Sequence, residues 1–322
     1  MKKIALIGIG SMGGGHYSCY KNIENAEVIA VADVRTKMAK EKVDNENIHI
    51  YSSLDELLKN EKPDIADICT PSYMHREMSI KCLEAGINVL CEKPMSLSSK
   101  DTAEIIKAAE KSGKLFMTAH VVRFMTPFMF LKNIIDSKEL GEPLRIDMKR
   151  MSKIPLWTWD DWMRDLKRSG GTPFDFTIHD IDFVQYVLGQ PKEVSAVYHK
   201  MRDDNDYIVS QLIYDNCIVS AECGWYKCEL EFMAEYNAIF EKGNVRYSDG
   251  KVFKNGEEIK LEAGEISENL GINLSGVDGY AAEIRYFIHC VENGIKPELV
   301  TPESSQNSIK LIERILENAI II

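Results

Sequence analysis

The stretch Lys3–Gly13, which reads KIALIGIGSMG, contains the pattern that decides the fold. Its first half is a short apolar run, typical of a buried strand. Its second half matches the spacing G-x-G-x-x-G and opens a helical pattern. Gly8 allows a tight turn, Gly10 lets the backbone approach a pyrophosphate, and Gly13 lets the helix lie close to the strand. Free N–H groups at the helix start suit a diphosphate. The stretch predicts a dinucleotide site, with a glycine-rich turn that binds nothing as the alternative.

An acidic residue lies where such a site holds the ribose. Asp33 comes 20 residues after Gly13, at the end of the apolar run Val28–Ala32. A carboxylate there accepts hydrogen bonds from both ribose hydroxyls and repels a 2′-phosphate, which favours NAD. Arg35 is able to pair with that phosphate, so NADP stays the alternative cofactor.

Short apolar runs alternate with amphipathic stretches over the first 120 residues. Ser98 and Asp101 are well placed to start one of the helices. Strand–helix alternation with short connections predicts a parallel, doubly wound sheet with helices on both faces. The predicted strands are 3–8, 27–33, 48–51, 65–69, 88–91 and 115–119, and the predicted helices include 74–85 and 98–111.

The pattern changes after Arg123. A helix is predicted over 124–140, ending at Gly141, and a tryptophan-rich loop follows. Strand-like alternation separated by turn signals fills 193–261, which predicts an α+β domain with a largely antiparallel open sheet. Further helices are predicted at about 174–188, 279–293 and 302–320. We therefore expect a Rossmann domain over 1–121 and a domain for substrate binding and oligomerisation over 122–322.

Composition excludes several classes of protein. Asp and Glu number 50 against 39 Lys and Arg, which argues against nucleic acid or an anionic membrane as a partner. No run approaches about 18 apolar residues, so no membrane span is expected, and the start at Met1 leads into a buried strand rather than a signal peptide. The eight cysteines form no C-x-x-C pair and fit no zinc spacing, so reduced thiols in the cytoplasm and no metal are expected.

Three separated motifs carry a family resemblance. The segments 70–75 (TPSYMH), 84–94 (EAGINVLCEKP) and 170–182 (GGTPFDFTIHDID) resemble signatures of the glucose–fructose oxidoreductase / inositol dehydrogenase (Gfo/Idh/MocA) family. The resemblance covers nearly the whole chain in the same order and includes Arg123-Phe124. Two positions depart from the family pattern: Ser72 stands where Asn is frequent, and Thr172 where a third Gly is common.

The resemblance implies that Lys93 is catalytic, together with Asp175 and His179. Lys93 follows the fifth predicted strand, at the sheet edge where ligands bind in doubly wound folds. Partial burial and the positive ring of oxidised nicotinamide would both disfavour its ammonium form, and Pro94 restricts its backbone to extended conformations.

Asp175 and His179 are four residues apart on a predicted helix and so share a face. His179 is able to accept or relay a proton, and Asp175 to hold a substrate hydroxyl or orient the base. Whether Lys93 or His179 takes the proton first stays open, and the pair is expected to titrate together. A surface Asp–His pair and a zinc site without a third ligand are the alternatives.

The tryptophan-rich loop suits a sugar pocket, because aromatic faces stack on the C–H faces of sugars. Plain packing of Trp157 and Trp159 against their domain is the alternative. The predicted substrate contacts are Lys93, His120, Arg123, Trp157, Asp160, Asp175, His179 and Tyr280. The predicted cofactor contacts are Gly8, Ile9, Gly10, Ser11, Met12, Gly13, Asp33, Val34, Arg35, Cys69, Thr70, Pro71, His75, Glu92, Lys93 and Trp162.

The resemblance implies an NAD(P)-dependent oxidoreductase that moves a hydride between nicotinamide and a secondary hydroxyl of a cyclic polyol or sugar. The run Ile178–Asp182 looks most like the inositol dehydrogenase branch. A glycosidase of the same fold that uses NAD transiently is one alternative, and a dinucleotide-sensing regulator without catalysis is another. A homodimer or homotetramer is expected, because an outer sheet face with Tyr, Ile, Phe and Met in alternation over 194–240 has no helices left to cover it.

Overall fold

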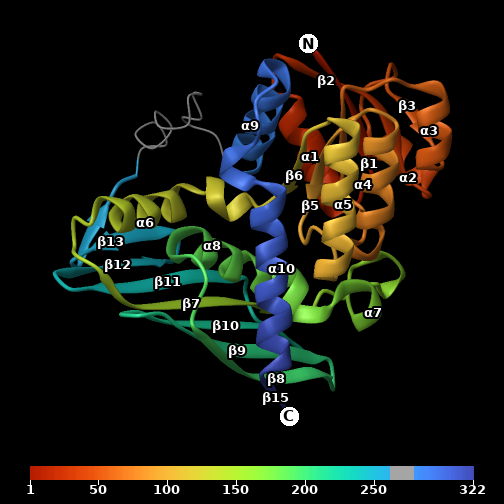
Figure 1. Cartoon of the computed structure of the whole chain (residues 1–322). Coiled ribbons are helices and arrows are strands. Elements are labelled where there is room, and N and C mark those ends of the chain that lie inside the picture. Colours follow the sequence, from red (N-terminus) through yellow and green to blue (C-terminus); the bar gives the residue numbers. More distant parts are fainter. Residues whose placement is uncertain (262–278) are drawn as a thin grey trace. The chain divides into compact units, whose positions relative to one another are not determined.

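The computed structural model describes residues 1–261 and 279–322 (Figure 1). The chain forms two compact units: residues 1–120 with 279–306, and residues 121–261 with 307–322. Helix α9 (Gly279–Asn293) therefore belongs to the first unit, whereas the sequence division placed it in the second domain. It packs on α1 (Ser11–Tyr20), and Arg285 donates a hydrogen bond of 2.8 Å to the carbonyl of Asn22.

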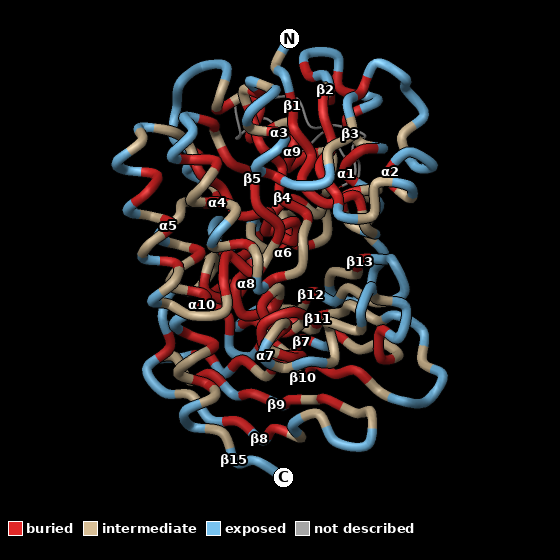
Figure 2. The backbone as a smooth tube through the Cα atoms, turned by 90° about the vertical axis from the view of Figure 1, so that its right-hand side faces the viewer, coloured by how far each residue is buried: buried red, intermediate tan, exposed pale blue. Residues whose placement is uncertain are grey.

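The first unit is built on a six-stranded parallel sheet with the strand order β3-β2-β1-β4-β5-β6, which confirms the doubly wound prediction. The strand order reverses its direction between β1 and β4. Doubly wound sheets bind ligands at this switch point, outside the carboxyl ends of the strands. Figure 2 shows that β1, β4 and β5 are buried along most of their length. The strands are β1 (Lys2–Ile7), β2 (Ala26–Ala32), β3 (His49–Tyr51), β4 (Ile65–Ile68), β5 (Asn88–Glu92) and β6 (Phe116–Ala119).

The helix that follows Ser98 has a capping residue at each end. The Ser98 hydroxyl accepts a hydrogen bond from the Asp101 amide at 3.1 Å, as predicted, and Gly113 ends the helix with φ of 67°. The other helices are α2 (Thr36–Lys42), α3 (Leu54–Asn60), α4 (His75–Glu84) and α5 (Ser99–Ser112).

The second unit contains a nine-stranded mixed sheet with the order β14-β13-β12-β11-β7-β10-β9-β8-β15. The pairs β7–β10 and β8–β15 are parallel and the others antiparallel, so the prediction of a largely antiparallel sheet is confirmed. The strands are β7 (Pro143–Lys153), β8 (Glu193–Arg202), β9 (Asn205–Ile213), β10 (Ile218–Tyr226), β11 (Met233–Phe240), β12 (Gly243–Ser248), β13 (Lys251–Lys254), β14 (Glu257–Ile259) and β15 (Ala319–Ile321).

Two elements differ from the sequence prediction. Strand β7 lies in the middle of the sheet, although the sequence suggested no regular structure there; only Ile146 and Met148 mark its buried face between charged residues. The last helix, α10 (Pro302–Glu317), ends before 320, and residues 319–321 pair with β8 as strand β15. A run of β-branched isoleucines favours this strand, which pairing to a sheet edge then stabilises.

The helices of the second unit cover one face of its sheet (Figure 1). They are α6 (Thr126–Ser137), α7 (Leu166–Ser169), a π-helical turn (Pro173–Thr177), α8 (Ile178–Leu188) and the second part of α10. The described residues place no helix on the opposite face, where Val197, Val209 and Ile218 are 39–48% exposed. Among all described helices, none combines the length and the apolar character needed to span a bilayer.

Candidate active site

The glycine-rich turn has the geometry that a pyrophosphate requires. Gly8 has a φ of 86°, and a Cβ there would lie 2.8 Å from the Cys69 carbonyl oxygen. A Cβ on Gly13 would lie 2.0 Å from the Gly8 oxygen, so the close approach of α1 to β1 requires glycine. A Cβ on Gly10 would lie 3.8 Å from its nearest neighbour, a guanidinium nitrogen of Arg35, so the side-chain face of Gly10 is open at the start of α1.

Asp33 is buried at the end of β2, and its carboxylate is already oriented. One oxygen accepts from the Ile9 amide at 3.0 Å and the other from the Arg35 amide at 2.8 Å. Burial alone would raise the pKa of Asp33, but these bonds and the Arg35 guanidinium outweigh it and hold the pKa below its usual value. The Arg35 side chain folds onto Asp33, with its Nε 3.2 Å from the carboxylate.

Lys42 is a site residue that the sequence did not reveal. From the last turn of α2 its Nζ donates to the Ile9 carbonyl at 3.0 Å and to the Gly10 carbonyl at 2.6 Å. It therefore brings a positive charge to the glycine-rich turn. No motif marks this lysine, because the contact joins residues 32 and 33 positions apart in the chain.

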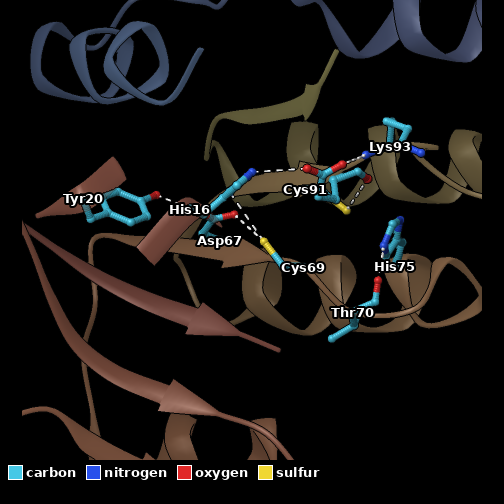
Figure 3. Close-up of polar contacts among 9 residues, drawn as sticks. His16, Tyr20, Asp67, Cys69, Thr70, His75, Cys91 and Lys93 are labelled. Carbon is cyan, nitrogen blue, oxygen red and sulfur yellow. Dashed lines mark hydrogen bonds and ion pairs between the residues drawn. The ribbon is translucent and has the colours of Figure 1, made fainter. Parts of the chain in front are cut away.

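The turn with Glu92, Lys93 and Pro94 lies at the carboxyl end of β5 (Figure 3). A Glu92 carboxylate oxygen accepts from the Lys93 backbone amide at 3.0 Å. His75 supports the turn from α4, with Nδ1 2.7 Å from the Pro94 carbonyl oxygen and Nε2 2.9 Å from that of Thr70. Burial lowers the pKa of His75 despite these contacts, so near neutral pH it donates to one carbonyl at a time.

Behind this turn lies a buried cluster of ionisable side chains that the sequence analysis missed. His16 of α1 places Nδ1 2.9 Å from Asp67 of β4 and Nε2 3.2 Å from Glu92 in an ion pair. Tyr20 donates to the same Asp67 oxygen at 2.9 Å (Figure 3). Burial alone would lower the pKa of His16, but the charge of Asp67 and its hydrogen bond raise it well above the usual value. The direction of this shift favours the imidazolium form of His16, which lies between two carboxylates.

The same cluster contains a set of metal-ligand types, because atoms of His16, Asp67 and Cys69 lie within 4.8 Å of one another. The His16–Asp67 distance of 2.9 Å is that of a direct hydrogen bond. Two ligands of one tetrahedral zinc ion lie about 3.3 Å apart or more, given bonds of about 2.0–2.3 Å. Cys69 contacts both partners at 3.5 Å, and burial raises the pKa of its thiol far above the usual range. The geometry therefore fits a hydrogen-bonded ion pair better than a metal site.

In the second unit, Asp175 lies in the π-helical turn and His179 in the first turn of α8. Asp175 is buried and His179 half-buried. Asp206 of β9 binds Thr172, the residue just before the π-helical turn. Its carboxylate accepts hydrogen bonds from the Thr172 amide at 2.5 Å and from the Met201 amide at 2.8 Å. The Thr172 hydroxyl donates to the Asp206 carbonyl at 2.7 Å, a bond that a glycine there would lack.

Two buried ion pairs anchor α8 on either side of Ile181. Asp180 pairs with Arg150 of β7 at 2.6 Å, and Asp182 pairs with Arg123 at 2.6 Å. The Arg123 guanidinium, predicted to contact substrate, binds Asp182 with two nitrogens and lies 4.6 Å from the Tyr186 ring centroid. In the structure, the Arg123 side chain therefore stabilises the position of α8, which belongs to the same unit.

The remaining predicted residues are distributed over both units. In the second, Trp157 and Trp159 are 69% and 41% exposed, Trp162 is half-buried, and Asp160 pairs with Arg168 at 2.7 Å. In the first, His120 is buried after β6, and the Tyr280 ring centroid lies 6.2 Å from that of His16. The cofactor candidates that end β1, β2, β4 and β5 come together at one edge of the first sheet: Gly8, Ile9, Gly10, Asp33, Cys69, Thr70, Glu92 and Lys93.

Comparison with known proteins agrees with this arrangement. Residues 2–120 match the model of the oxidoreductase family with an NAD-binding Rossmann fold (GFO_IDH_MocA), and residues 128–246 match the family's C-terminal domain. A levoglucosan dehydrogenase solved with NADH and levoglucosan is 18% identical, with a TM-score of 0.83 over 98% of this chain and 96% of that one.

Two curated relatives are more similar in sequence. Myo-inositol 2-dehydrogenase of Thermotoga maritima is 32% identical over 61% of this chain and 57% of that protein. A 2,7-anhydro-N-acetylneuraminate hydratase of Mediterraneibacter gnavus is 31% identical over 59% of this chain and 50% of that protein. The matched segments thus span about half of the length of these relatives. With both family domains present in order, the chain belongs to the Gfo/Idh/MocA oxidoreductase family and carries its NAD-binding Rossmann domain.

Proposed function

We propose that the protein is an NAD-dependent dehydrogenase that oxidises a secondary hydroxyl of a cyclic polyol or sugar. The observation that carries the proposal is the Glu92-Lys93-Pro94 turn, which fixes the Lys93 backbone at the carboxyl end of β5. The same sheet edge carries the glycine-rich turn and the oriented Asp33. A named inositol dehydrogenase among the relatives supports this substrate class.

The proposed chemistry assigns a role to each ionisable group. Bound NAD supplies the hydride acceptor. The Lys93 amine takes the proton of the reacting hydroxyl, with His179 as a second group able to accept or relay it. Asp175 holds a substrate hydroxyl. The two hydrogen bonds between Thr172 and Asp206 keep the helical turn that contains Asp175 in place.

A panel of inositols, sugars and sugar derivatives with NAD tests the proposal through the absorbance of reduced nicotinamide. We expect net NADH with at least one cyclic polyol or sugar. One relative is named a hydratase, and adding water to a substrate changes no net oxidation state. The alternative for this protein is therefore a reaction in which NAD is reduced and reoxidised within one turnover. Mass spectrometry of the same mixtures separates the two, because the alternative yields a new product without net NADH.

Cofactor preference follows from Asp33 and Arg35. We expect the protein to prefer NAD, and Asp33→Ala to lower its NAD-over-NADP affinity ratio by about tenfold or more. The substitution removes the ribose acceptor and frees the Arg35 guanidinium for a 2′-phosphate. Binding titrations with both cofactors measure the ratio, and Asp33→Ala combined with Arg35→Ala should lose the gain for NADP. Tighter binding of NADP than NAD by the unmodified protein would overturn the assignment.

The open sheet face of the second unit supports a homo-oligomer. Val197, Val209 and Ile218 are exposed there, beside stacked rings of His199, Tyr207 and Tyr226 with centroids 4.7 and 5.4 Å apart. Two-fold pairing of such faces is the simplest closed assembly. Light scattering at micromolar concentration should show a dimer or tetramer, and Val209→Glu should dissociate it. A single species of monomer mass would refute the prediction. We also propose a cytoplasmic location, because the sequence has eight cysteines without a C-x-x-C pair, which suits a reducing compartment.

A further inference from the structure

The acid in the middle of β4 has no place in the chemistry described so far. Asp67 is 0% exposed in a strand whose other members are apolar, and burying a carboxylate is costly unless it is paired. Its partners are His16 and Tyr20 of α1 and, more distantly, Cys69. None of these side chains reaches the surface, so the cluster does not bind an external ligand directly.

The cluster nevertheless ends at the proposed catalytic turn. His16 presents one ring nitrogen to Asp67 and the other to Glu92, and Glu92 accepts from the Lys93 backbone amide. A contact chain therefore runs from β4 through α1 to the residue before Pro94 (Figure 3). Burial alone would raise the pKa of Glu92, but its ion pair with His16, 3.2 Å away, keeps it below its usual value, so Glu92 remains an acceptor.

We propose that Asp67 and His16 are positioning residues for Lys93, because they hold the Glu92 carboxylate against the Lys93 amide. The physical reason lies in the two N–H groups of an imidazolium. A neutral imidazole has one N–H, and if it donates to residue 67, its other nitrogen presents a lone pair to Glu92. The charge of Asp67 keeps both nitrogens protonated, and so keeps Glu92 in place. The inference rests on the proposed function only in naming Lys93 as catalytic.

The test compares Asp67→Asn with the control Asp64→Asn in the full chain. Asp67→Asn keeps the shape and the acceptor but removes the charge. Asp64, the residue just before β4, accepts a hydrogen bond from the Lys3 amide at 2.8 Å and lies outside the cluster. For Asp67→Asn we expect faster hydrogen exchange at the Lys93 amide, unchanged exchange in β1 and β5, and ¹⁵N shifts of His16 that change from imidazolium to imidazole. We expect the turnover number to fall by about tenfold or more, with the KM for NAD within about twofold of the original value. Asp64→Asn should change none of these.

Unchanged Lys93 exchange in a folded Asp67→Asn protein would overturn the inference. If that variant does not fold, His16→Gln is the second probe: its amide donates to one carboxylate at a time, so Lys93 exchange must again rise. Hydrogen exchange at the Lys93 amide is measured without substrate turnover. Its result therefore separates a failure of the contact chain from a failure of the proposed function. Faster Lys93 exchange with normal turnover would support the contact chain and contradict a catalytic Lys93.

Discussion

Replacing Lys93 with alanine is expected to lower turnover by about a hundredfold or more, the range for removal of a positioned general acid or base. The proposed role places the Lys93 amine at the reacting hydroxyl, and alanine removes this proton acceptor. NAD should still bind, because the glycine-rich turn and Asp33 are supported by contacts that do not involve this side chain. Steady-state kinetics on the best substrate and calorimetric titration with NAD measure the two effects separately.

Lys111→Ala is the matched control for this experiment. Lys111 is an exposed lysine in the last turn of α5, in the same unit as Lys93. Both variants remove one lysine side chain, but only Lys93→Ala changes the proposed active site. Near-normal turnover of Lys93→Ala would remove Lys93 from the mechanism, and His179 would become the base to test.

Asp180→Ala is expected to destabilise the second unit by about 3–5 kcal/mol, since it removes the carboxylate that pairs with the buried Arg150 guanidinium. Both side chains are at most 5% exposed, and the closest nitrogen–oxygen distance is 2.6 Å. All four tryptophans lie in this unit, so urea unfolding followed by tryptophan fluorescence reports on it. A double variant with Arg150→Met and Asp180→Leu should recover most of the loss, because apolar groups of similar volume replace the pair.

An exposed pair on the same strand supplies the comparison. Arg145 and Asp147 of β7 are 2.8 Å apart, with the arginine side chain 61% exposed. Asp147→Ala should therefore cost less than about 1 kcal/mol. Equal losses for the two aspartate variants would show that burial does not govern the Asp180 pair.

The first sheet was predictable because its signals are local. Lys3–Gly13 specifies a strand, a turn and a helix within one continuous segment, and the later apolar runs of β4, β5 and β6 are buried almost throughout. Strand β7 escaped prediction because only one face is buried and charged residues interrupt its apolar pattern. Its central place depends on pairing with β10 and β11, about 70–100 residues further along the chain.

The residues of the proposed site likewise fall into those that the sequence revealed and those that it did not. Gly8, Asp33 and Lys93 follow strands, so position in the sequence is enough to bring them to one sheet edge. The cluster behind them joins His16, Asp67 and Glu92 from three separate elements, and no spacing rule links these residues. One signal was nevertheless present: an aspartate within the apolar run Ile65–Ile68 requires a buried partner.

The most direct test of the account follows the hydride itself. The best substrate of the panel is prepared with deuterium on the carbon that bears the reacting hydroxyl and is incubated with NAD and the protein. The account predicts that reduced nicotinamide accumulates with one deuterium for each molecule of ketone formed. Product that forms while NAD stays oxidised, or reduced nicotinamide without deuterium, would contradict a net dehydrogenase.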